Sequence, residues 1–449
     1  MKYLYTYLLA LISGGAFAQQ RLSLVECRDM ALQHNKKNKA SVIQIEKAKY
    51  DVRTYRAKFF PHISAQGNAF FSQHAAEKTL PEQHLPTFAP GTIIPNGVAY
   101  IPEIPIKLDI NNNWTVGVAA NQPLFMGGKI IAAYRMAKIG EELSRLNQSL
   151  TNAEVVYETD NAYWSLLKVE EMATVAKKYE EVVEQLLKDM ENAFDVGMKS
   201  RNDLLKVKVK LNEAKLNRRR AENAITLARM NLCHIIGVSL LEDIKVADDE
   251  LDVESSQFNI VSDIVMRPEY KLLSKNLDLK YEEIRLTRAD YLPKVGVRIG
   301  YNYIDALKLN KTSLVKGGNL TALFSVSIPL FQWGEGLNKV RSKRAEHKIA
   351  DLQRDDASEK MMLEMTMALN QVDESKLEVE MTSEALGQAE ENLKTSSEQF
   401  EVGLETLTEH LEAQTMWQRA WAQFIQAKAD LHINETHYLK ASGQLDANY

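Results

Sequence analysis

The chain has 449 residues, of which 55 are basic and 60 acidic, so its formal charge is −5. This balance argues against a general nucleic-acid-binding protein, which needs a basic face. With only Cys27 and Cys233, the sequence excludes a disulfide scaffold and a cysteine zinc site, and we expect two free buried thiols. Only 20 glycines and 11 prolines are present, which favours long uninterrupted helices.

The first 18 residues are typical of a cleaved signal peptide. Lys2 precedes an apolar stretch, and Ala16-Phe17-Ala18 has the small-x-small pattern of a cleavage site. No later run of 18 apolar residues follows, so no transmembrane helix is expected. The sequence therefore predicts export without a helical membrane span.

Residues 19–60 are predicted to be a helix, and residues 61–123 a β-hairpin. After Pro61, apolar and polar residues alternate, as they do in the residues before Pro123. Six prolines lie between these two strands, so the sequence predicts a loop over 74–112 without regular structure.

Residues 124–237 contain no proline, and their apolar residues follow the a/d pattern of long helices that pack side by side. Leucines and small or aromatic residues recur at steps of three and four, as in Leu143, Leu146, Leu150, Ala153 and Tyr157. The pattern predicts one helix over 129–194, a turn near Gly197, and a second helix over 203–236. An irregular belt is expected over 238–265, followed by a helix within 266–292.

The second half of the chain repeats the first. Pro123-Leu124-Phe125 matches Pro329-Leu330-Phe331 at an offset of 206, and Phe194-Asp195-Val196-Gly197 matches Phe400-Glu401-Val402-Gly403 at the same offset. Arg56-Ala57 and Pro61 match Arg288-Ala289 and Pro293 at an offset of 232. The repeat predicts a second hairpin over 293–329 with a loop at 304–317, long helices over 330–443 with a turn near 403, and a short tail over 444–449.

The four predicted strands each have one apolar face and about the length of a tilted membrane strand of roughly 10 residues. An open sheet edge would leave unpaired backbone groups in lipid, and four strands cannot close a barrel. Several copies must therefore share one barrel; a dimer supplies 8 strands and a trimer 12. The alternative is a soluble sandwich, for which the sequence offers no partner sheet.

The order and duplication of these elements resemble the TolC family of outer membrane factors, over about residues 22–443. The resemblance implies a mainly α protein with a membrane β part: a homotrimer with a 12-stranded β-barrel in the outer membrane of a Gram-negative bacterium and a periplasmic α-helical barrel. Hairpin loops 74–112 and 304–317 would then face outside the cell. It also implies a passive exit duct for efflux or type I secretion, working with a periplasmic adaptor protein and an inner-membrane pump of RND, ABC or MFS type. A trimeric coiled-coil adhesin or stalk is the alternative.

The resemblance also implies three sets of site residues. Glu409 and Glu412 stand six and nine positions after Gly403 and would form an acidic ring at the periplasmic mouth, with Glu405 and Asp203 as further candidates. Adaptor docking is expected at the two tip turns, Phe194, Val196, Gly197, Met198, Phe400, Val402, Gly403 and Leu404. Strands and helices are expected to join at Pro61, Pro123, Gly128, Pro293, Pro329 and Gly334.

No enzymatic signature is present in the sequence, because phosphate-loop, nucleophile-elbow, H-E-x-x-H and C-x-x-C patterns are all missing. The methionines at 361, 362, 365 and 367 are interpreted as core filling rather than a soft-metal site. We therefore expect no enzyme, no cofactor and no metal site.

Overall fold

The computed structural model describes residues 21–71, 76–109, 113–248, 251, 263–309 and 312–445, so the expected signal peptide lies outside the described residues. The chain divides into two compact units. One comprises residues 49–140 and 278–348 and holds all strands except two short ones, together with the adjoining helix ends; the other is mainly helical and comprises residues 1–48, 141–277 and 349–449. Within the described part, no helix is long and apolar enough to cross a membrane.

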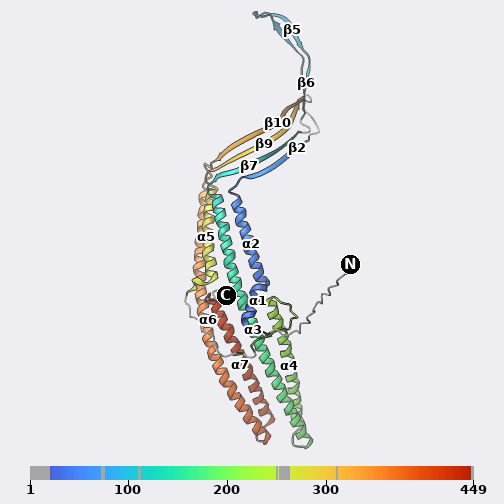
Figure 1. Ribbon diagram of the computed structural model, residues 1–449, viewed down its shortest axis with the longest axis vertical. Helices are drawn as coiled ribbons and strands as arrows, with labels where there is room; N and C mark the ends of the chain where they lie inside the picture. The colour runs from blue at the N-terminus through green and yellow to red at the C-terminus, as the bar shows by residue number, and fades with distance from the viewer. Residues whose placement is uncertain are drawn as a thin grey trace, which may run out of the picture. The chain divides into compact units, whose positions relative to one another are not determined.

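Long helices dominate the chain, as the sequence predicts (Figure 1). The two longest, α3 and α6, have 67 residues each. The same steps of three and four recur further along α3 at Tyr179, Val183, Leu186 and Met190, and these four side chains are buried, so the pattern marks a packing face there. The helices are α1 (Leu24–His34), α2 (Lys36–Ala57), α3 (Lys129–Asp195), α4 (Arg201–Ile236), α5 (Pro268–Ala289), α6 (Glu335–Glu401) and α7 (Leu407–Ala441).

The single helix expected over 19–60 is wrong, because the chain breaks at Asn35 between α1 and α2. Asn35 has an extended backbone with ψ 134°, and its side chain accepts a hydrogen bond from the Lys37 backbone N–H at 2.8 Å. The same side chain donates to the Ile235 carbonyl at 2.9 Å. Asparagine competes for backbone bonds in this way and so favours helix ends over helix interiors.

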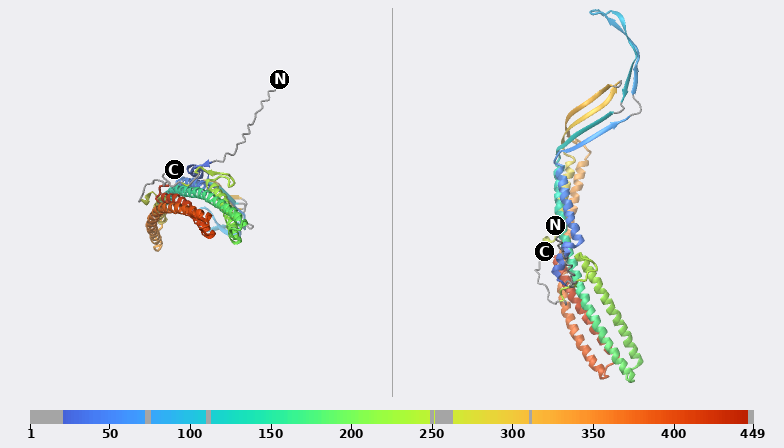
Figure 2. Two further views of the ribbon diagram at one scale, coloured as in Figure 1. Left: turned by 90° about the horizontal axis from the view of Figure 1, so that it is seen from below. Right: turned by 45° about the vertical axis from the view of Figure 1, so that its right-hand side comes forward.

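Four strands, in the order β2, β7, β9, β10, form the main part of a six-stranded antiparallel sheet, and Figure 2 shows them side by side; the other two strands, β6 and β3, join it through a short pairing of β6 with β9. The four are β2 (His62–Phe70), β7 (Asn113–Met126), β9 (Lys294–Leu309) and β10 (Thr312–Ser327). The pairing of β7 with β9 joins the two repeats, and β2 and β10 remain as the outer edges of this four-strand set.

The register confirms the two faces that the alternation predicts. Ile63, Ala120, Ile299 and Ala322 stand in one cross-strand row, and Ala65, Val118, Tyr301 and Leu320 stand in another on the same face. The opposite face carries rows such as Gln66, Gly117, Asn302 and Asn319. One side of the sheet is therefore apolar and the other polar.

The loop predicted over 74–112 is wrong, because its described residues form β3 (Ala76–Leu80), β4 (Gln83–Phe88), β5 (Pro95–Ile101) and β6 (Ile104–Asp109). These strands pair as β3 with β6 and β4 with β5. Pro86 pairs with Val98, and Pro105 pairs with Thr79. The end of β6 also pairs with β9, at Leu108 and Asp109, but at both prolines the ribbon has only two strands. Each strand is an edge there, so a proline costs no ladder hydrogen bond on its open side.

The second predicted loop, 304–317, is also mostly strand. β9 and β10 continue in register to the Leu309–Thr312 pair, so each strand has 16 residues rather than about 10. The expected length of about 10 residues rests on membrane thickness, whereas an antiparallel ribbon can continue pairing beyond that thickness.

Apolar clusters and buried ion pairs stabilise the packing of the helical unit. One cluster unites Leu22, Cys27, Tyr163, Leu232 and Ile425 from four different helices and β1 (Arg21–Leu22). Both cysteines lie in this cluster and are free, as expected. Burial raises the pKa of the Cys27 thiol to about 12, which makes it a poor nucleophile at neutral pH.

The belt predicted over 238–265 is described only in part, since residues 249–250 and 252–262 lie outside the described ranges. β8 (Lys245–Val246) pairs in parallel with β1, and a 3₁₀ turn covers Ile264–Met266. The Lys428 ammonium bonds to the Leu251 carbonyl at 3.1 Å and to the Glu171 carboxylate at 3.2 Å, which fastens this segment to α3 and α7.

Candidate functional site

The two helix-to-helix turns near 197 and 403 have the same geometry. Gly197 has φ 75° and Gly403 has φ 77°, a left-handed conformation that favours glycine. The Met198 N–H donates to the Ala193 carbonyl at 2.8 Å, and the Leu404 N–H donates to the Gln399 carbonyl at 2.9 Å. Each is the hydrogen bond between residues five apart that ends a helix in a Schellman motif.

Both turns carry exposed apolar side chains. Val196, Met198, Val402 and Leu404 are each at least 70% exposed. Phe400 is more enclosed, because the Lys199 ammonium of the first turn lies 4.5 Å from the centroid of its ring. That cation–π contact joins the two turns into one end of the helical unit.

Two of the four acidic candidates cap helices. The Glu409 carboxylate accepts hydrogen bonds from the Thr406 backbone N–H at 2.8 Å and from its hydroxyl at 2.7 Å. Asp203, at the matching position of the first repeat, accepts from the Ser200 hydroxyl at 2.7 Å. Thr406 therefore holds the pKa of Glu409 below its usual range, and Ser200, helped by Lys206, does the same for Asp203.

Glu412 and Glu405 have different surroundings. Glu412 is exposed on α7, one turn after Glu409. Glu405 lies in the turn, and one of its carboxylate oxygens is buried without a hydrogen-bond partner among the described residues. The acidic ring itself stays a prediction, because it needs more than one copy of the chain.

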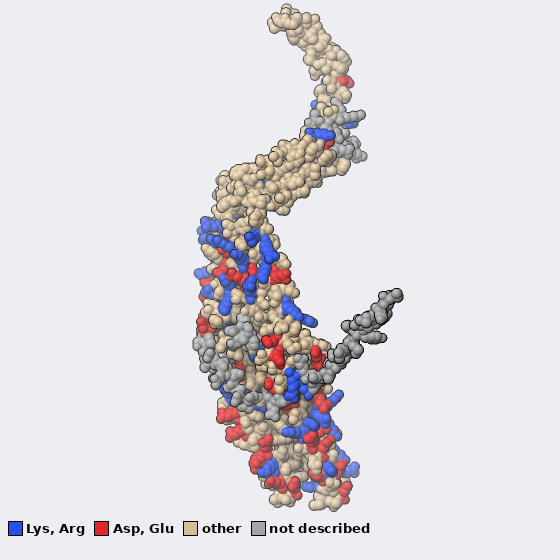
Figure 3. Space-filling view, viewed as in Figure 1, with Lys and Arg blue, Asp and Glu red and all other residues tan. Residues whose placement is uncertain are grey.

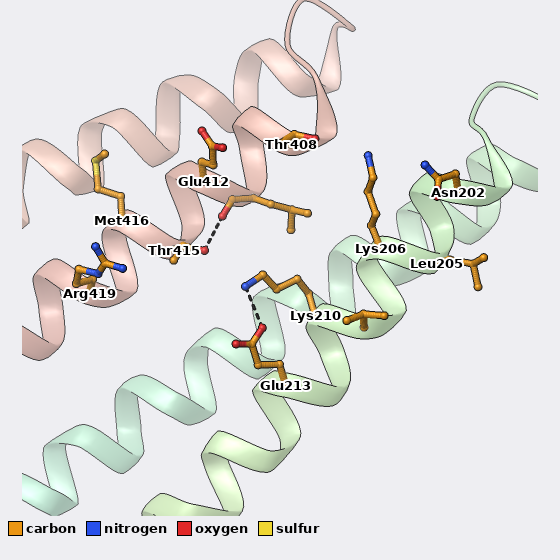
Figure 4. A pocket seen from close by; sticks show the side chains of 12 residues that line it. Asn202, Leu205, Lys206, Lys210, Glu213, Thr408, Glu412, Thr415, Met416 and Arg419 are labelled. Carbon is orange, nitrogen blue, oxygen red and sulfur yellow. Dashed lines mark hydrogen bonds and ion pairs between the residues drawn. The ribbon is translucent and has the colours of Figure 1, made fainter.

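A groove of about 840 Å³ lies between α4 and α7 beside the tip turns. In Figure 4, Lys206, Lys210 and Glu213 lie on the α4 side, and Glu412, Met416 and Arg419 lie on the α7 side. Lys210 pairs with Glu213 at 3.0 Å, and Lys206 pairs with Asp203 at 3.5 Å. The groove combines an apolar floor with charges of both signs. Sequence reasoning missed it, because α4 and α7 belong to different repeats.

His410 is a buried residue that sequence reasoning also missed. Its ring stacks on Phe400 with 4.9 Å between centroids and 5° between planes. Its Nδ1 lies 3.0 Å from the Ser396 hydroxyl, and its Nε2 lies 2.9 Å from the Gln414 amide nitrogen. Burial lowers the pKa of His410, so the imidazole is neutral at pH 7.

The predicted junction residues lie where strands meet helices in the strand unit. Pro61 and Pro293 directly precede β2 and β9, and Pro329 follows the end of β10. Gly128 and Gly334 have φ 86° and 80° and directly precede α3 and α6. Pro123 differs, because it lies inside β7 at a register shift.

The chain matches known proteins over most of its length. Residues 27–238 and 267–444 match the family model described as "Outer membrane efflux protein". The outer membrane efflux protein BepC of Brucella suis biovar 1 (strain 1330) is 20% identical over 348 residues, which are 76% of this chain and 74% of BepC.

Solved structures show the same fold. The Campylobacter jejuni CmeC outer membrane channel aligns with a TM-score of 0.73 at 17% identity, over 94% of this chain and 85% of CmeC. The open state of the Neisseria gonorrhoeae MtrE outer membrane channel aligns with a TM-score of 0.71 at 17% identity, over 94% of this chain and 89% of MtrE.

Proposed function

Because this chain belongs to the outer membrane efflux protein family, we propose that it is the outer-membrane exit duct of a tripartite efflux pump or a type I secretion system. Such a duct is a channel and not an enzyme. The observation that carries the proposal is the four-stranded sheet with one apolar face and two open edges, on a chain whose long helices end in two matched turns.

Three copies would complete the duct. Twelve strands would close the sheet in the outer membrane, and the helices would continue the passage into the periplasm after export by a cleaved signal peptide. A periplasmic adaptor would dock on the exposed apolar turns, and an RND, ABC or MFS-type pump of the inner membrane would supply the energy. An adhesin or stalk would have no need for two matched turns in mid-helix, which favours the duct.

The first test concerns conduction and the acidic ring. Glu409→Gln together with Glu412→Gln removes two charges per chain, and glutamine keeps the capping bonds to Thr406. In planar bilayers we expect cation-preferring pores in the natural protein, and weaker cation preference and divalent block in this variant.

Glu398→Gln with Glu401→Gln is the matched control, since it removes two exposed charges from α6 close to the same end. Unchanged currents in the Glu409/Glu412 variant would refute the ring, whereas a natural protein that forms no pore would refute the duct.

The second test concerns adaptor docking at the tip. Proline cannot adopt φ 77°, so Gly403→Pro should disrupt the turn and abolish export while trimers remain in the membrane. Leu404→Asp should have the same effect without breaking the turn, because it removes an exposed apolar contact. Leu404→Met keeps that contact and serves as the control; normal export by the Asp variant would count against docking here.

A further inference from the structure

The helix ends in the strand unit carry a basic collar. We define this collar as the Lys and Arg residues of the ranges 49–60, 129–140, 278–292 and 335–348, which together hold 15 basic and 7 acidic side chains. The whole chain, by contrast, has 55 basic and 60 acidic side chains. On the face that Figure 3 shows, Lys and Arg side chains gather, with some Asp and Glu among them, on the helices next to the strands, and the surface of the strands is almost free of charge.

Both repeats place basic residues at the same positions of this collar. Arg53 and Arg56 of α2 match Arg285 and Arg288 of α5 at the offset of 232. Arg135 and Lys138 of α3 match Arg341 and Arg344 of α6 at the offset of 206. Each pair has a spacing of three, which puts both side chains on one helix face, and all eight are exposed. The duplication indicates one role performed in each half of the chain.

One basic pair of each repeat meets within this chain, where α3 and α5 enclose a pocket of about 290 Å³ next to the strands. Its lining includes Ile131, Arg135, Arg285, Arg288 and Leu292. Gly127 brings the start of α3 against the end of α5, because a Cβ there would lie only 2.6 Å from the Ala289 carbonyl oxygen.

The pocket carries an excess of positive charge. Its single acid, Glu282, bonds through one oxygen to Arg285 at 3.0 Å and to Arg135 at 3.5 Å. Arg288 has no carboxylate within ion-pair distance in the described part of the chain. Three guanidinium groups and one carboxylate give the pocket a net positive charge, which a singly charged phosphodiester can partly neutralise. Arginine binds such a group with two hydrogen bonds.

Exposed aromatic side chains lie between the strands and the basic collar. Phe60, Phe331 and Trp333 are 61%, 72% and 89% exposed, and each stands within a few residues of a strand end. Trp333 takes the position that Gly127 holds in the first repeat, and it does so with φ 51°. Aromatic rings collect at the level of lipid headgroups, so the collar lies at the depth of the phosphates.

We propose that the α3–α5 pocket binds the headgroup of an anionic phospholipid of the periplasmic leaflet, with Arg285 and Arg288 holding its phosphate and Ile131 and Leu292 contacting the start of its chains. This inference rests on the proposed function, because the sheet must lie in the outer membrane for the pocket to meet that leaflet. Since β10 of one copy would meet β2 of the next, Arg341 and Arg344 would form the equivalent pocket with Arg53 and Arg56 of the adjacent copy.

Native mass spectrometry of the full-length protein purified in detergent tests this directly. Phosphatidylglycerol and phosphatidylcholine with identical acyl chains are titrated in parallel, and we expect phosphatidylglycerol to bind more tightly. Arg285→Gln with Arg288→Gln should weaken phosphatidylglycerol binding roughly 25-fold, about fivefold for each lost charge. Arg53→Gln with Arg56→Gln should weaken it similarly at the second class of pocket.

Arg219→Gln with Arg220→Gln is the matched control, since it removes two exposed arginines from α4, outside the strand unit. Equal binding of the two lipids, equal loss in this control, or displacement of the lipid by millimolar inorganic phosphate would overturn the proposal. Pore formation by the Arg285/Arg288 variant in phosphatidylcholine bilayers would show that the duct stands even if the lipid pocket fails.

Discussion

The stability of the packing at the helical tip should depend on pH through His410. Its buried ring stacks on Phe400 and bonds to Ser396 and Gln414, and burial lowers its pKa. In the unfolded chain the imidazole takes up a proton below its ordinary pKa of about 6.5. The contribution of the neutral ring is therefore complete above that pH and is lost as the pH falls toward the lowered folded pKa.

Hydrogen exchange checks this prediction. Amide protection factors of residues 394–412 should fall between pH 7.5 and pH 5.5, and His410→Gln should flatten that dependence. His437→Gln is the control, because burial also lowers the pKa of His437 but this residue lies elsewhere on α7. An unchanged pH dependence in His410→Gln would contradict the assignment.

Asp160 forms a buried ion pair whose loss should strongly lower the free energy of unfolding. Its carboxylate is fully buried and receives hydrogen bonds from Arg28 at 2.5 and 2.6 Å and from Thr436 at 3.0 Å. Burial raises the pKa of Asp160, and Arg28 opposes that rise. Arg28→Ala leaves the carboxylate unpaired, so the free energy of unfolding should fall by about 3–5 kcal/mol.

Lys37→Ala offers the contrast. Lys37 pairs with Glu158 at 2.6 Å, but both side chains are substantially exposed. Denaturant unfolding should therefore register a loss of about 0–1 kcal/mol. Similar losses in the two variants would show that burial does not control the strength of these pairs.

Among the secondary-structure elements, the assignment of an apolar and a polar face to the sheet can be tested directly by substitution. Val118 of β7 stands between Ala65 and Tyr301 on the apolar face, whereas Gln66 of β2 lies on the polar face. Val118→Lys should cost about 2–4 kcal/mol in lipid, and the matched Gln66→Lys should cost little. The amount of heat-resistant trimer in isolated outer membranes measures the difference; equal losses would mean that the faces are misassigned.

The periodic parts of these elements were predictable from the sequence. Helical periodicity predicts α3, the period of two predicts the strands, and the internal repeat predicts α6 and the turns at Gly197 and Gly403. These signals are local, so a single chain reveals them. At Asn35 the local signal is only an asparagine, which favours helix ends, and its second bond runs to Ile235, 200 residues away, which no local pattern reveals.

Proline was a poor guide in the segment 74–112. The rule that proline ends strands holds for central strands, but β4 and β5 form a ribbon with two free edges. Glu409 follows Thr406 at the spacing of a capping box, so its capping role can be predicted from the sequence, whereas the acidic ring rests on its charge alone. The α4–α7 groove and the α3–α5 pocket depend on tertiary packing between repeats.

For the whole molecule, one physical requirement connects sheet, helices and function. A four-stranded sheet with an apolar face cannot remain open in lipid, because unpaired N–H and C=O groups along β2 and β10 would each cost several kcal/mol. On the proposed function, other copies of the chain supply the missing partners, and the passage that they enclose is the duct.

Native mass spectrometry of the complex released from lipid nanodiscs tests this claim most directly. We expect a single species with three times the mass of the mature chain, because the three copies stay together on release from lipid. A stable, fully folded single chain in the same nanodiscs would contradict it.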